Sequence, residues 1–140
     1  MYRAPVPLQT WSGQLQGNAL KTGAATGGRF MRHQLNRGSY GQVLILGVDD
    51  KACNRNMGEY TPFELYYYSW LCEVPNSPGL SKQMCDDIIR MSRTVVAGQR
   101  GHHDLLSSKA YKTIGCAFAP NTGVQQCAGW KSVWACDLGY

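Results

Sequence analysis

Two adjacent histidines, His102 and His103, are the first residues of this sequence that suggest chemistry. An imidazole titrates near neutral pH and is a common metal ligand, so it can serve as acid, base or ligand. The pair lies in the stretch 101–117, whose end reads as a buried strand carrying a cysteine. Neighbouring residues on a helix point about 100° apart, so one histidine alone can face a given site. We take His102 as the candidate and expect His103 to face solvent.

Six cysteines are dispersed along the chain, at positions 53, 72, 85, 116, 127 and 136. No Cys-x-x-Cys pair is present, so the close ligand pair of zinc ribbons and fingers is missing. An even set of cysteines in a small, glycine-rich chain instead predicts up to three disulfides and an oxidising compartment. Several pairings are possible, so the spacing leaves the connectivity open. No serine or cysteine lies in a recognised nucleophile motif.

The elements that must position these residues follow from the hydrophobic pattern. The run 43–48 is apolar on both faces, which is typical of a central strand covered on two sides. Thr61 and Glu64 form a capping box for a helix that ends near Pro75. Further helices are expected after Ser12 and after Ser81, and further strands at 113–119 and 130–136. This alternation predicts an α/β fold with helices on both faces of a small sheet.

The helix expected after Ser12 has an apolar stripe but weak intrinsic stability. Leu15, Ala19 and Leu20 recur at helical spacing. Each glycine in a helix costs about 1 kcal/mol relative to alanine, and this helix contains three of them, Gly13, Gly17 and Gly23. We therefore expect packing, rather than propensity, to hold it.

Length and charge limit the functional classes. The chain has 140 residues, which predicts a single domain over 1–140 with an ordinary core. Its 14 Lys and Arg exceed its nine Asp and Glu, but they are scattered and not interleaved with aromatics, so no nucleic-acid partner is expected. No segment predicts a transmembrane helix. No signal peptide follows Met1, whereas disulfides favour secretion, and we resolve this conflict by expecting a processed or truncated form.

The order of several short motifs resembles the CAP superfamily, which comprises cysteine-rich secretory proteins, antigen 5 allergens and plant pathogenesis-related proteins of type one. His33, seven residues before Tyr40, is similar to the family's His-Ser…Tyr-Gly-Glu-Asn segment, and Trp70-Leu71-Cys72-Glu73 matches its Trp-x-x-Glu. The stretch 101–117 keeps both ends of its Gly-His…Ile-Gly-Cys-Ala block. With an entry motif at 7–12 and a closing motif at 133–140, the resemblance covers nearly the whole chain, without the start of the first helix.

This resemblance implies a three-layer α-β-α sandwich with a cleft lined by two histidines and two acids. The histidines carry over to His33 and His102 and one acid to Glu73, while the other acidic position holds an amide, Gln42. Two imidazoles and a carboxylate can bind zinc or another divalent cation. Alternatively, Glu73 can accept a hydrogen bond from a metal-binding histidine and orient it without binding the metal itself. Because Gln42 removes one negative charge, we expect a weakened cleft.

The resemblance also suggests a disulfide between Cys116 and Cys136, with the other four cysteines paired in an order left open: Cys53, Cys72, Cys85 and Cys127. It implies a secreted, allergen-like or pathogenesis-related protein that binds a lipid, a sterol or a protein partner, and binding is favoured over catalysis. Two alternatives remain, a structural subunit of an extracellular assembly and a metal-dependent hydrolase.

Overall fold

The computed structural model describes residues 9–47, 60–75, 79–92, 101–123 and 132–140. Four strands form one mixed sheet in the order β1-β3-β4-β2. The strand β4 pairs antiparallel with β2 on one side and with β3 on the other, and the two-residue β1 pairs parallel with β3. The strands are β1 (Thr10–Trp11), β2 (Gly41–Gly47), β3 (Thr113–Pro120) and β4 (Ser132–Gly139).

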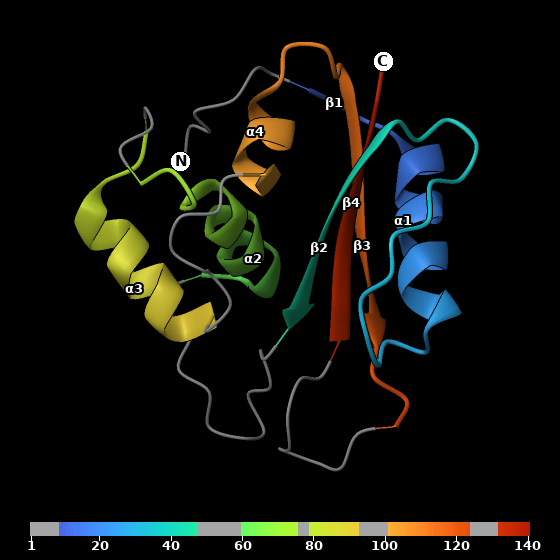
Figure 1. The fold of residues 1–140 in the computed structure, drawn as a ribbon, viewed down its shortest axis with the longest axis horizontal. Helices are drawn as coiled ribbons and strands as arrows, with labels where there is room; N and C mark the ends of the chain where they lie inside the picture. Colours follow the sequence, from blue (N-terminus) through green and yellow to red (C-terminus); the bar gives the residue numbers. More distant parts are fainter. Residues whose placement is uncertain (1–8, 48–59, 76–78, 93–100, 124–131) are drawn as a thin grey trace.

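Helices cover both faces of this sheet, which gives the predicted three-layer α-β-α sandwich (Figure 1). One helix, α1 (Gly13–Ala25), lies on one face, and the other three lie on the opposite side: α2 (Pro62–Leu71), α3 (Lys82–Ser92) and α4 (Gly101–Ser107). The pattern predicted three helices and three strands, and the structure adds β1 and α4. None of the described helices is long and apolar enough to cross a membrane.

The larger core lies between the sheet and the three helices α2, α3 and α4. Trp70 of α2 is buried there, and its indole Nε1 donates to the backbone oxygen of Leu44 in β2 at 3.1 Å. The aromatic run 66–68 packs mostly inward, because Tyr66 and Tyr68 are buried and Tyr67 is half-buried. The predicted capping box is present, with Thr61 and Glu64 each bonded to the other's backbone N–H.

Two disulfides lie in this part of the chain. Cys116 and Cys136 are direct cross-strand neighbours in β3 and β4 and are bonded to each other, which is the pair that the resemblance suggested. A second disulfide joins Cys72, at the end of α2, to Cys85 in α3. The remaining cysteines, 53 and 127, lie outside the described residues.

On the other face, α1 lies almost directly on β3, because two glycines leave no side chain between them. A Cβ on Gly115 of β3 would collide with the α1 backbone at Leu15 and Gln16. A Cβ on Gly23 of α1 would come within 2.8 Å of the Cβ of Ala119 in β3. Packing therefore holds this glycine-containing helix, as expected, and the missing side chains of its glycine contacts allow the helix to approach β3 closely.

Candidate functional site

A histidine and a carboxylate predicted as site residues, His102 and Glu73, lie side by side between α2 and α4. Glu73 follows the end of α2, and His102 is the second residue of α4. The Nδ1 of His102 lies 2.7 Å from Glu73 Oε2, and the backbone N–H of His103 donates to Glu73 Oε1 at 3.0 Å. Both oxygens of Glu73 are therefore engaged, and the carboxylate holds the start of α4 against the end of α2.

The two partners differ in burial, so the carboxylate lies inside the protein while part of the imidazole faces outward. The Glu73 side chain is only 5% exposed, whereas that of His102 is 34% exposed. Since a carboxylate accepts hydrogen bonds, the Nδ1 of His102 carries the proton, and its Nε2 then has a free lone pair when the ring is neutral. No residue in the described ranges bonds to Nε2. A buried carboxylate thus fixes an imidazole whose second nitrogen can contact a ligand.

The other predicted pair, His33 and Gln42, lies in a separate polar cluster on the α1 side of the sheet, where Gln42 is buried and His33 is exposed. The Nδ1 of His33 lies 2.9 Å from Gln42 Oε1, and the amide nitrogen of Gln42 donates to Asp137 Oδ1 at 2.8 Å. Gln42 and Asp137 are direct partners across β2 and β4. The second oxygen of Asp137 accepts from the hydroxyl of Ser39 at 2.6 Å.

Asp137 is a site residue that sequence reasoning missed. Its side chain is fully buried, and burial raises its pKa, although hydrogen bonds from Ser39 and Gln42 and the charge of nearby His33 act in the opposite direction. The sequence did hold one signal, since Asp137 is the single charged residue in the apolar run 132–139. The cluster also explains the amide at Gln42, because a glutamate there would set a second carboxylate against Asp137.

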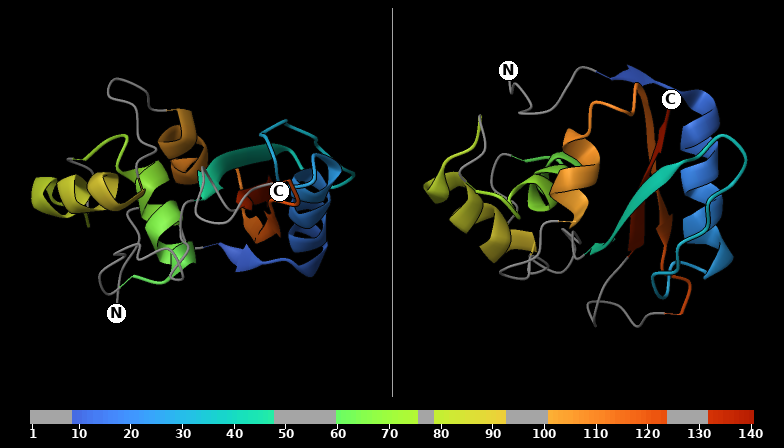
Figure 2. Two further views of the ribbon diagram at one scale, coloured as in Figure 1. Left: turned by 90° about the horizontal axis from the view of Figure 1, so that it is seen from below. Right: turned by 45° about the horizontal axis from the view of Figure 1, so that its top comes forward.

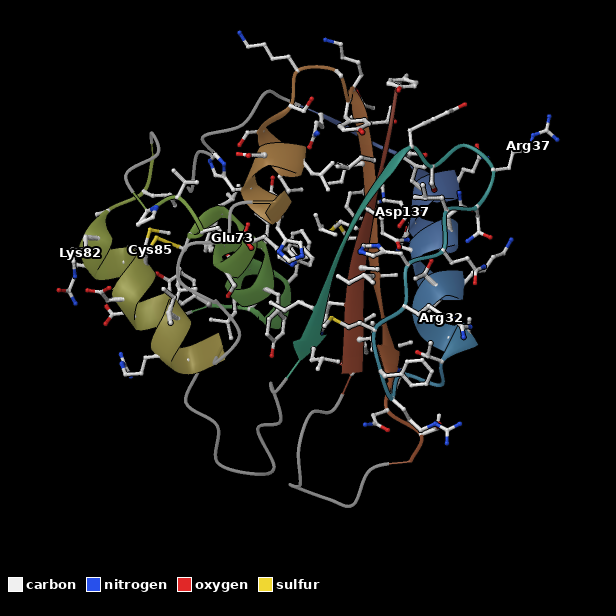
Figure 3. The ribbon with its side chains drawn as sticks, viewed as in Figure 1. Arg32, Arg37, Glu73, Lys82, Cys85 and Asp137 are labelled. Carbon is white, nitrogen blue, oxygen red and sulfur yellow. A yellow bond between two sulfur atoms is a disulfide. The ribbon has the colours of Figure 1, made fainter. Side chains whose placement is uncertain are left out.

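The structure does not bring the four predicted residues into one cleft. Gln42 and Asp137 lie on the sheet face that α1 covers, whereas Glu73 and His102 belong to the layer of α2 and α4 on the opposite side (Figure 3). Within the described residues, no three His, Cys, Asp or Glu side chains are placed to hold a metal ion. Among the residues that the structure describes, His33 bonds to Gln42 on the α1 side whereas His102 bonds to Glu73 in the opposite layer, so His33, Glu73 and His102 do not form a three-ligand zinc site.

The prediction that His103 faces solvent was wrong, since this residue is 8% exposed. His103 shares the buried side of α4 with Leu106, three residues later, because residues at this spacing lie on the same face of a helix. Its Nδ1 lies 3.1 Å from Asp104 Oδ1, and its Nε2 lies 3.3 Å from the hydroxyl of Ser107.

The order Ser107, His103, Asp104 is that of a serine-hydrolase triad, but the surroundings differ from those of an active site. Asp104 is half exposed, at 52%, so it is solvated and does not resemble the buried acid of a triad. Residues four apart on a helix are neighbours in any case, so the contact between Ser107 and His103 follows from helix geometry. We interpret these bonds as stabilising the short helix α4.

Comparison with models of known protein families finds no match, and comparison with curated proteins finds no significant match either. The resemblance to the CAP superfamily therefore stays a prediction from the order of the sequence motifs.

Proposed function

We propose that this chain is a CAP-like extracellular binding domain that recognises a lipid, a sterol or a protein partner and does not act as an enzyme. The observation that carries this proposal is the pair formed by Glu73 and His102, in which a buried carboxylate fixes a partly exposed imidazole. The two disulfides and the α-β-α sandwich support an extracellular CAP-like protein, since disulfides persist in oxidising compartments.

Binding is favoured over catalysis because the pair lacks a nucleophile. No hydroxyl or thiol in the described residues is bonded to His102 Nε2, and the described cysteines are consumed in disulfides. What remains is a fixed hydrogen-bonding group beside the ring of Trp70, whose centroid lies 6.3 Å from that of His102. In ligand sites, a few fixed polar groups beside apolar side chains set the orientation of the ligand.

The same geometry limits the chemical class of the ligand. A neutral imidazole with its proton on Nδ1 accepts a hydrogen bond at Nε2, so it suits a hydroxyl group. We therefore propose a mainly apolar ligand with one hydroxyl group, of which a sterol with a single hydroxyl group is an example.

Native mass spectrometry of the protein, incubated with a sterol that carries a single hydroxyl group, tests this proposal. We expect the wild-type protein and His33→Ala to retain the sterol and His102→Ala to lose it, because only His102 lies at the proposed anchor. His33→Ala is the matched control, since it removes an imidazole from the opposite layer. Equal retention by both variants, or no retention by the wild-type protein, would contradict the proposal.

A further inference from the structure

The first third of the chain carries positive charge alone. Residues 1–48 contain five of the 14 Lys and Arg and none of the nine Asp and Glu. The described part of this region comprises β1, α1, β2 and the irregular segment between α1 and β2, which runs alongside α1 in both views of Figure 2. The helix α1 and the segment that follows it therefore come from a part of the sequence whose Lys and Arg are not balanced by any Asp or Glu.

A polar stripe on α1 fixes the segment 30–37 in place. Four side chains of this stripe are spaced four residues apart, so they share one side of the helix, and each donates to a backbone oxygen of the segment. The bonds are Thr26 to Phe30 at 2.7 Å, Thr22 to Gln34 at 2.9 Å, Asn18 to Arg37 at 2.9 Å and Gln14 to Arg37 at 3.0 Å. The segment is thus bound to the helix through its backbone, which leaves side chains to face outward.

The outward side chains combine large apolar groups with cations. Phe30, Met31 and Leu35 are 50%, 47% and 56% exposed. Arg32 and Arg37 of the same segment are also exposed, and Figure 3 shows Arg37 pointing away from α1 and the sheet. The Arg32 guanidinium lies 5.9 Å from the centroid of the Phe30 ring. We call these five residues the basic-apolar face.

No acid in the described residues neutralises this face. Asp137, the described carboxylate on the α1 side of the sheet, is fully buried and is hydrogen-bonded to Ser39 and Gln42. The remaining described acids lie on the opposite layer, in or next to its helices: Glu64, Glu73, Asp86, Asp87 and Asp104. The recorded salt bridges involve neither Arg32 nor Arg37.

We propose that the basic-apolar face docks the protein on the surface of an anionic phospholipid bilayer. Arginine forms paired hydrogen bonds with phosphate, and exposed Phe, Met and Leu side chains enter the boundary between head groups and acyl chains. An acidic peptide would match the two arginines alone, whereas a bilayer supplies phosphate and hydrocarbon together. This inference goes beyond the proposed function, because it uses the layer opposite His102 and does not depend on the sterol anchor.

Vesicle flotation tests this proposal with two charge-matched variants. The probe is phosphatidylcholine vesicles with and without about 30% phosphatidylglycerol, a composition that supplies the negative surface potential which attracts basic residues. Arg32→Gln/Arg37→Gln removes two charges from the face, and Lys82→Gln/Arg90→Gln removes two from α3. We expect the first variant to bind anionic vesicles about 25-fold more weakly than the wild-type protein, at about fivefold per cation, and the second to change binding little.

Two further variants separate the contributions. Phe30→Ser/Leu35→Ser keeps the charge and should also weaken binding, while circular dichroism reports that the fold is intact. His102→Ala should bind vesicles as the wild-type protein does, so failure here is distinguishable from failure of the sterol proposal. The docking proposal is overturned if neutral and anionic vesicles bind equally, if both charge variants behave alike, or if poly-glutamate binds the protein and vesicles do not.

Discussion

Replacing Gly115 with alanine should push α1 away from β3. The new Cβ would lie 2.6 Å from the backbone oxygen of Ser12 and would also meet the backbone at Leu15 and Gln16. These are backbone atoms of the N-terminal end of α1, so no side chain can rotate to make room. Overpacking of a well-packed core costs about 1–3 kcal/mol, and a clash with backbone belongs at the upper end, about 3 kcal/mol.

Chemical denaturation measures this effect against a control substitution in α1 that lies outside the contact with β3. Gly17 lies within α1, and a Cβ there would meet no atom within 4 Å. Gly17→Ala should therefore raise the free energy of unfolding by about 0.5–1 kcal/mol, through helix propensity alone. Equal effects of Gly115→Ala and Gly17→Ala would refute the close approach of α1 to β3.

Three further predictions concern the polar clusters. Burial raises the pKa of Asp137 in the folded protein, so folding favours the protonated form of this side chain. The free energy of unfolding of the wild-type protein should therefore fall as the pH rises from the ordinary aspartate range through the raised pKa. In denaturation curves recorded over a series of pH values, Asp137→Asn should remove this fall. Gln42→Glu should destabilise the protein at neutral pH by on the order of 3 kcal/mol, with recovery in acid, and no pH dependence of the loss would argue against carboxylate repulsion. A fluorophosphonate probe should leave Ser107 unlabelled in intact-mass analysis, and labelling that Ser107→Ala abolishes would show a reactive serine.

Local sequence signals were sufficient for much of the fold. The capping box at Thr61 and the apolar run of β2 each depend on neighbouring residues, and both are present in the structure. The alternation of helical and extended stretches indicated the α-β-α layering. The short β1 escaped this reasoning, because its two residues become a strand only through pairing with β3.

The site was harder to predict, since its contacts depend on register and on helix phase. Asp137 meets Gln42 because β2 and β4 pair in one particular register, which neither strand specifies alone. His103 was expected to face solvent and is buried, because the sequence alone does not show which side of α4 packs against the core. These positions are set by tertiary packing, and single-sequence patterns do not contain it.

The proposed role of His102 can be measured directly by NMR of the histidine rings during addition of a sterol that carries a single hydroxyl group. The chain has three histidines, so the ring signals can be assigned with single substitutions. We predict that the His102 ring signals shift and saturate with the sterol while those of His33 stay unchanged. Sterol binding that leaves the His102 signals in place, or that shifts His33 alone, would contradict the assignment of the Glu73–His102 pair as the ligand anchor.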